Sequence, residues 1–135
     1  MTLFNWSSFL DVANEIKQKL ASCATFSDLE YGYIRTGIGR AYYAAYWYAK
    51  IYLSTVDPLF KTTYKGPGSH ELVVDKLKEQ RGKHQGISTL LGSLKNQRVQ
   101  ADYYNDRLSV RDLDLALIRA ENVIKQLQEI EDSKS

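Results

Sequence analysis

The sequence contains few of the residues that cross-link or interrupt a chain. Its single cysteine, Cys23, cannot form an internal disulfide, which argues against a disulfide-built scaffold and suits a reducing compartment. Proline occurs only as Pro58 and Pro67, so long helices are permitted almost everywhere else. No run approaches the roughly 18 consecutive apolar residues of a membrane span, and Met1–Asn5 lacks a basic region followed by an apolar run. These absences predict a cytoplasmic protein that does not enter the membrane.

The motifs of several enzyme classes are also missing. The sequence has no glycine-rich phosphate loop, no paired His or Cys spacing typical of a metal site, and no nucleophile elbow. Cys23 has neither histidine near it in sequence and is a poor candidate nucleophile. We therefore expect no cofactor and no metal, and whether the protein is an enzyme stays open.

Charge is unevenly distributed along the chain. The whole sequence has a net charge of +2, whereas residues 35–111 carry thirteen Lys or Arg and six Asp or Glu, a net charge of +7. Both ends are acidic. A basic middle attracts phosphates, but an ordinary solvated, lysine-rich surface has the same composition, and both interpretations stay open.

Apolar residues recur three and four positions apart, and no segment shows the strict alternation of a half-buried strand. This periodicity predicts helices over about Ser7–Cys23, Asp28–Val56, His70–Gln80, Ile87–Tyr103 and Val110–Glu131. The stretch Lys61–Gly68 is expected to be an exposed loop. The length of 135 residues fits one domain, 1–135. The predicted fold class is therefore all-α, a single up-and-down bundle of four to five helices.

Two local features refine this prediction. Ser109, with Asp112 three residues later, resembles the capping box that starts a helix. The second helix contains three glycines, each of which costs a helix about 1 kcal/mol relative to alanine. Close helix contact or ligand approach would explain these glycines, which are Gly32, Gly37 and Gly39.

Two arginines occupy positions where apolar residues are expected. Arg98 continues the apolar stripe of the fourth helix and should point inward, where Asp102 is within reach of an ion pair. Arg40 lies in the middle of the aromatic second helix and must be paired, stacked on a ring or open to a cleft. A purely structural Arg98–Asp102 bridge and a ligand-binding role both fit this pattern.

The histidines and tyrosines also allow two interpretations. His70 falls on the inner face of the third helix, where a satisfied core or capping histidine is commoner than a catalytic one. His84 is expected in a glycine-flanked loop without a role. Most of the ten tyrosines, which cluster at residues 31–52 and 103–104, are expected to line the core with their hydroxyls at the surface, although base stacking is the alternative.

One stretch resembles a known family. Residues from Arg35 to Tyr46 read RTGIGRAYYAAY, similar to the R-x-x-I-S-R-A-Y-Y-A-A-F helix of one HEPN subfamily, helical partners of nucleotidyltransferases. Three further segments agree in order and spacing, and together they span nearly the whole chain. They are Phe4–Trp6, Gly68–Glu71 and Arg98–Tyr103.

The resemblance implies a helical bundle that commonly forms a homodimer, with a groove between protomers. Many HEPN proteins are metal-independent endoribonucleases, and some are toxins of toxin–antitoxin or defence systems whose partner is a nucleotidyltransferase. Their catalytic motif is an Arg followed a few residues later by a His. Here Arg98 is present, but residues 99–104 contain no His. His70 is the residue that would supply the imidazole from another helix.

We therefore expect a HEPN-like module that binds a nucleotide, RNA or a nucleotidyltransferase-type protein partner. The predicted cleft consists of Arg40, His70, Arg98, Asp102 and Tyr103. Two alternatives remain. The first is an active ribonuclease toxin that depends on Arg98. The second is a purely structural helical dimer in which the polar cluster fixes the register of the subunits.

Overall fold

A computed structural model describes residues 4–57, 60, 69–80 and 82–134, and this part of the chain forms five helices and no strand. The helices are α1 (Ser8–Ala21), α2 (Asp28–Val56), α3 (Ser69–Glu79), α4 (His84–Tyr103) and α5 (Val110–Ser133). The predicted all-helical bundle is confirmed, with most helix ends within two residues of those expected from periodicity. The expected loop Lys61–Gly68 lies outside the described residues.

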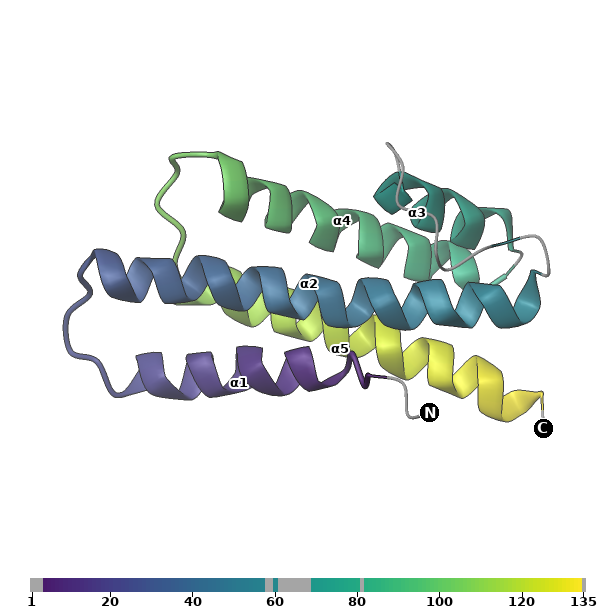
Figure 1. The fold of residues 1–135 in the computed structure, drawn as a ribbon, viewed down its shortest axis with the longest axis horizontal. Helices are drawn as coiled ribbons and strands as arrows, with labels where there is room; N and C mark the ends of the chain where they lie inside the picture. The colour runs from purple at the N-terminus through teal and green to yellow at the C-terminus, as the bar shows by residue number, and fades with distance from the viewer. Residues whose placement is uncertain (1–3, 58–59, 61–68, 81, 135) are drawn as a thin grey trace.

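Helix α2 is the centre of the bundle and packs against all four other helices (Figure 1). Figure 1 shows α1, α2, α4 and α5 running in alternating directions along the long axis, with the short α3 against one end of α4. This position explains why α2 is apolar and aromatic nearly all round, since it has neighbours on most sides. Its fully buried alanines, Ala41, Ala44, Ala45 and Ala49, allow the neighbouring helices to approach closely.

The glycines of α2 have different surroundings. A Cβ added at Gly37 would lie 2.8 Å from Cδ1 of Leu113, on α5, and 3.4 Å from Cγ2 of Ile16, on α1. A Cβ added at Gly32 or Gly39 would meet nothing within 4 Å. The expected close helix contact therefore exists at Gly37 and does not explain the other two glycines.

Helix ends follow local side-chain chemistry. The backbone N–H of Ser109 donates to the Asp112 carboxylate at 2.7 Å, which confirms the predicted capping box of α5. The Glu30 carboxylate accepts from the Ser27 backbone N–H at 2.8 Å at the start of α2, and hydrogen bonding to Ser27 lowers the pKa of Glu30. Helix α4 starts at His84, so the prediction that His84 belongs to a loop is wrong.

Candidate functional site

Arg98 faces α2 from α4, as its place on the apolar stripe predicts. Its side chain is 15% exposed, and its Nε lies 3.1 Å from Oδ2 of Asp102, one turn further along α4. Its Nη2 donates a hydrogen bond of 2.8 Å to the hydroxyl of Tyr43. The intrahelical ion pair is therefore present, and the same guanidinium also contacts the central helix.

His70 approaches the same face of the bundle from α3. Its Nδ1 lies 2.5 Å from the hydroxyl of Tyr42. Its ring stacks on Tyr46, with centroids 4.5 Å apart and planes inclined by 25°. The imidazole is therefore packed and hydrogen-bonded, in agreement with a satisfied histidine, while it remains only half-buried.

Arg98 and His70 meet on one set of tyrosine rings. The Cζ atom of Arg98 lies 5.9 Å from the ring centroid of Tyr42 and 5.5 Å from that of Tyr43. The His70 ring lies 5.6 Å and 6.0 Å from the same two centroids. Spacing on α2 explains the platform, because Tyr46 lies four residues after Tyr42 and three after Tyr43, and residues three or four apart are neighbours on a helix surface. We call this group the His70–Arg98 cluster: Tyr42, Tyr43, Tyr46, His70, Arg98, Asp102 and Tyr103.

Burial and charge determine the protonation of the cluster. Burial lowers the pKa of His70, and the positive charges of Arg98, Lys95 and Lys50 lower it further. Burial raises the pKa of Tyr42, which is 0% exposed. At neutral pH the imidazole is therefore uncharged and the Tyr42 side chain is a phenol.

The hydrogen bond between Tyr42 and His70 indicates where the imidazole proton lies. Among the described residues, His70 is the partner of the Tyr42 hydroxyl, and we expect the phenol to donate to Nδ1, because the buried O–H would otherwise have no acceptor. A neutral imidazole that accepts at Nδ1 carries its proton on Nε2. In this expected tautomer, His70 donates a hydrogen bond through Nε2 and does not accept a proton there.

The rim of the cluster combines positive charge with an exposed ring. Tyr103 is 73% exposed, and its ring centroid lies 5.9 Å from Cζ of Arg98. Lys95 pairs with Glu71 at 3.3 Å, and the buried Lys50 has its Nζ 4.7 Å from the ring centroid of Trp47. The exposed part of the cluster therefore offers the Tyr103 ring beside Arg98 together with the Lys95–Glu71 pair, while Lys50 is shielded from solvent.

Arg40 is the predicted cleft residue that the structure places elsewhere. Its guanidinium lies over the ring of Phe9, on α1, with Cζ 4.8 Å from the centroid. Trp6, just before α1, stacks on Trp47 of α2 with ring centroids 4.3 Å apart. Of the five residues predicted to form a cleft, Arg98 contacts Asp102 and Tyr103, and His70 shares its tyrosine rings, whereas Arg40 stacks on α1.

Arg35 has a structural role that the sequence did not reveal. Its guanidinium donates to the backbone carbonyls of Gln100, at 3.2 Å, and Ala101, at 2.7 Å, and also to the carbonyl of Asp106. These carbonyls belong to the last turn of α4 and the link to α5. Arg35 therefore holds the helix end that carries Asp102 and Tyr103, and no local signal could reveal partners at least 65 residues away.

His84 also has an unexpected partner. Its Nε2 lies 2.6 Å from the hydroxyl of Tyr52, and the two rings stack with centroids 5.6 Å apart. The expectation that His84 has no role is therefore corrected, because it joins the start of α4 to the C-terminal half of α2.

The fold and site together define a helical bundle with an arginine–histidine–tyrosine cluster on one face. Within the described part of the chain, no three His, Cys, Asp or Glu side chains are placed to hold a metal ion, and no helix is long and apolar enough to cross a membrane. Comparisons with family models, curated proteins and solved structures found no match.

Proposed function

We propose that the chain is a HEPN-like helical module that binds a phosphate-bearing ligand, RNA or a nucleotide, at the His70–Arg98 cluster. The supporting observation is that Arg98 and His70 reach the same tyrosine rings from two different helices. Two lysines close enough to affect the pKa of His70 add positive charge. This combination suits an anion with an attached base.

Three groups of the cluster would contact the ligand. A guanidinium has five N–H donors, and the contacts of Arg98 with Tyr43 and Asp102 leave others for phosphate oxygens. The Nε2–H of His70 adds a neutral donor. The exposed ring of Tyr103 offers a face on which a base can stack.

The test is a titration of fluorescently labelled single-stranded RNA, followed by anisotropy, with a mononucleotide as competitor. Arg98→Ala should weaken binding at least about tenfold, since charge-assisted hydrogen bonds contribute about 1.5–3 kcal/mol. Arg98→Lys should recover part of the loss, because a lysine keeps the charge and loses the planar fork.

Arg111→Ala is the matched control, since it removes the same charge from an exposed site on α5. Its affinity should stay within about twofold of the wild type, because isolated surface charges contribute little. If Arg98→Ala and Arg111→Ala lost the same affinity, the binding would depend on the general charge of the surface and not on Arg98. Failure of the wild type to bind either RNA or nucleotides would overturn the proposal.

An active ribonuclease is the second candidate function. The observation in its favour is that His70 and Arg98 lie near the same Tyr43 ring, where His70 would take the place of the missing motif histidine. The expected tautomer, with its proton on Nε2, argues against it, because a general base must present an unprotonated nitrogen to the ribose hydroxyl. Metal-free incubation of RNA with wild type, Arg98→Ala and His70→Ala distinguishes the candidates. Cleavage lost in both variants would establish the ribonuclease, and equally intact RNA would exclude it.

A homodimer and a nucleotidyltransferase partner remain predictions from the resemblance. Light scattering on the purified chain tests the dimer, and co-purification with a nucleotidyltransferase encoded beside it tests the partner. In a purely structural dimer, Arg40→Ala and Arg98→Ala would lower the melting temperature or dissociate the subunits, and no phosphate ligand would raise that temperature.

A further inference from the structure

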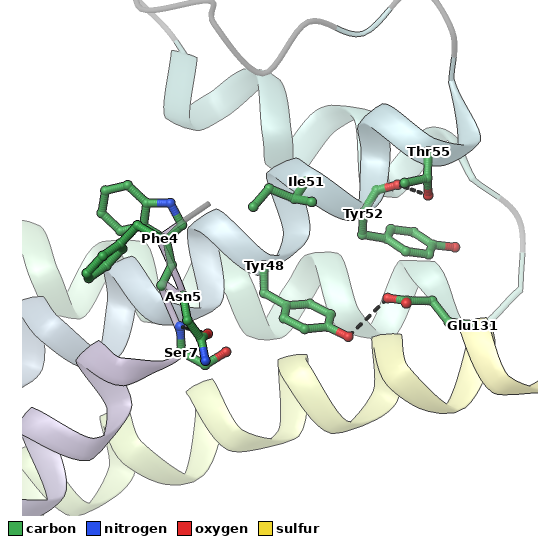
Figure 2. A pocket seen from close by; sticks show the side chains of 9 residues that line it. Phe4, Asn5, Ser7, Tyr48, Ile51, Tyr52, Thr55 and Glu131 are labelled. Atoms are coloured by element: carbon green, nitrogen blue, oxygen red, sulfur yellow. Dashed lines mark hydrogen bonds between the residues drawn. The ribbon is translucent and has the colours of Figure 1, made fainter. Parts of the chain in front are cut away.

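A separate pocket lies where the segment before α1, the C-terminal half of α2 and the end of α5 come together (Figure 2). Its volume is about 280 Å³, and none of its lining residues belongs to the His70–Arg98 cluster. Four aromatic side chains form much of its wall: Phe4, Trp6, Tyr48 and Tyr52. Such a size is near the lower end for small-molecule sites.

One carboxylate stands among these rings. Glu131 is the charged side chain among the lining residues that the structure describes, and its Oε1 accepts a hydrogen bond of 3.1 Å from the Tyr48 hydroxyl. Figure 2 shows this carboxylate directed at Tyr48, with the ring of Tyr52 beside it. A fixed negative charge beside aromatic faces is the arrangement that recognises organic cations.

Two further observations agree with this preference. The Nζ atom of Lys134 lies 5.7 Å from the ring centroid of Tyr52, so a cation of the chain already approaches this wall. Burial raises the pKa of Tyr48 to about 12, and the hydrogen bond and charge of Glu131 contribute to the increase. Tyr48 therefore stays a neutral phenol that donates to the Glu131 carboxylate, and this carboxylate is exposed and so remains accessible to a cation that enters the pocket.

We propose that this pocket binds a small organic ammonium ion, with Glu131 as its counter-ion and the aromatic rings around its apolar substituents. The pocket does not extend the phosphate site, because a carboxylate at its wall repels phosphates. The inference is independent of the proposed function at the His70–Arg98 cluster.

The experiment compares choline with 3,3-dimethylbutan-1-ol, a neutral molecule of nearly the same shape. Trp6 lines the pocket and stacks on Trp47, the only other tryptophan, so tryptophan fluorescence reports occupancy. Choline should bind saturably and at least about tenfold more tightly than the alcohol. Equal affinity of the two would show a merely apolar pocket and overturn the proposal.

Glu131→Gln removes the charge and keeps an acceptor for the Tyr48 hydroxyl, so the variant should fold normally. It should weaken choline binding at least about tenfold and leave the alcohol within about twofold. Glu129→Gln is the matched control, because Glu129 is exposed on the same helix end and does not line the pocket. If both variants lost the same affinity for choline, the effect would come from the general negative charge at the end of α5. That result would contradict the proposed site.

A lysine side chain of another protein carries the same ammonium chemistry as a free small molecule. Nα-acetyl-lysine N-methylamide, added in place of choline, distinguishes these sources. Tighter binding of choline would support a free quaternary ammonium ligand, and tighter binding of the lysine derivative would support a peptide side chain. Binding of neither would overturn the proposal.

Discussion

The hydroxyl of Tyr42 lies 2.5 Å from Nδ1 of His70 and connects the central helix to α3. Tyr42 is fully buried and stays a phenol, because burial raises its pKa. If this phenol donates to Nδ1, as we expect, the proton of the neutral imidazole lies on Nε2. The direction of this one hydrogen bond then decides whether His70 offers a donor or an acceptor to a ligand.

The tautomer of His70 is the first prediction. In long-range proton–nitrogen correlation spectra at neutral pH, Nδ1 should have the shift of an unprotonated nitrogen and Nε2 that of a protonated one. Tyr42→Phe should give a mixture of tautomers and lower the free energy of unfolding by about 1–3 kcal/mol, because it removes a buried hydrogen-bond partner. A protonated Nδ1 in the wild type would contradict the assignment.

The second prediction concerns pH. Burial and neighbouring positive charges lower the pKa of His70 from its ordinary value of 6.5. As pH falls below that value, the unfolded chain binds a proton before the folded one, so the free energy of unfolding decreases. The free energy of unfolding stops decreasing once the pH is below the pKa of His70 in the folded chain. Above the pKa of the unfolded chain, the contribution of His70 to stability is fully present.

Urea unfolding at about pH 7.5 and about pH 5.5 measures this effect in a range where histidines titrate. The wild type should be more stable at the higher pH, and His70→Gln should lose much of the difference. His84→Gln, which changes the other histidine, should retain it. A pH difference as large in His70→Gln as in the wild type would refute the prediction.

The third prediction concerns Arg35. Its guanidinium holds the carbonyls of Gln100, Ala101 and Asp106, so Arg35→Ala should lower the free energy of unfolding by about 2 kcal/mol. Arg111→Ala, a surface change, should stay within about 0.5 kcal/mol of the wild type. Chemical denaturation measures both. If Arg35 positions Asp102 and Tyr103 as well, their amide resonances should shift in the folded variant.

The fourth prediction distinguishes two glycines of one helix. Gly32→Ala should stabilise the protein by about 0.5–1 kcal/mol, because the new methyl group meets nothing and alanine favours the helix. Gly37→Ala should be less stable than Gly32→Ala, since its Cβ would lie 2.8 Å from Cδ1 of Leu113. Thermal unfolding compares the two, and an equal gain in both would disprove the close contact at Gly37.

Local spacing predicted much of the fold. Three- and four-residue apolar periods predicted the five helices, and the Ser109–Asp112 capping box was read from neighbouring residues. The Arg98–Asp102 pair was expected for the same reason, because residues four apart lie on one helix face. Such features depend on a few consecutive residues and little else.

Other features depend on which helices become neighbours. Arg40 stacks on Phe9 and Arg35 caps α4, although neither partner lies near it in sequence. The sequence by itself determined the helices and the inward direction of Arg98, because the helical repeat sets the phase of each side chain. Only the tertiary structure brought His70 and Arg98 onto the same tyrosines, because this contact requires both α3 and α4 to pack on α2. How these helices pack depends on the side chains of the whole core and not on a few consecutive residues.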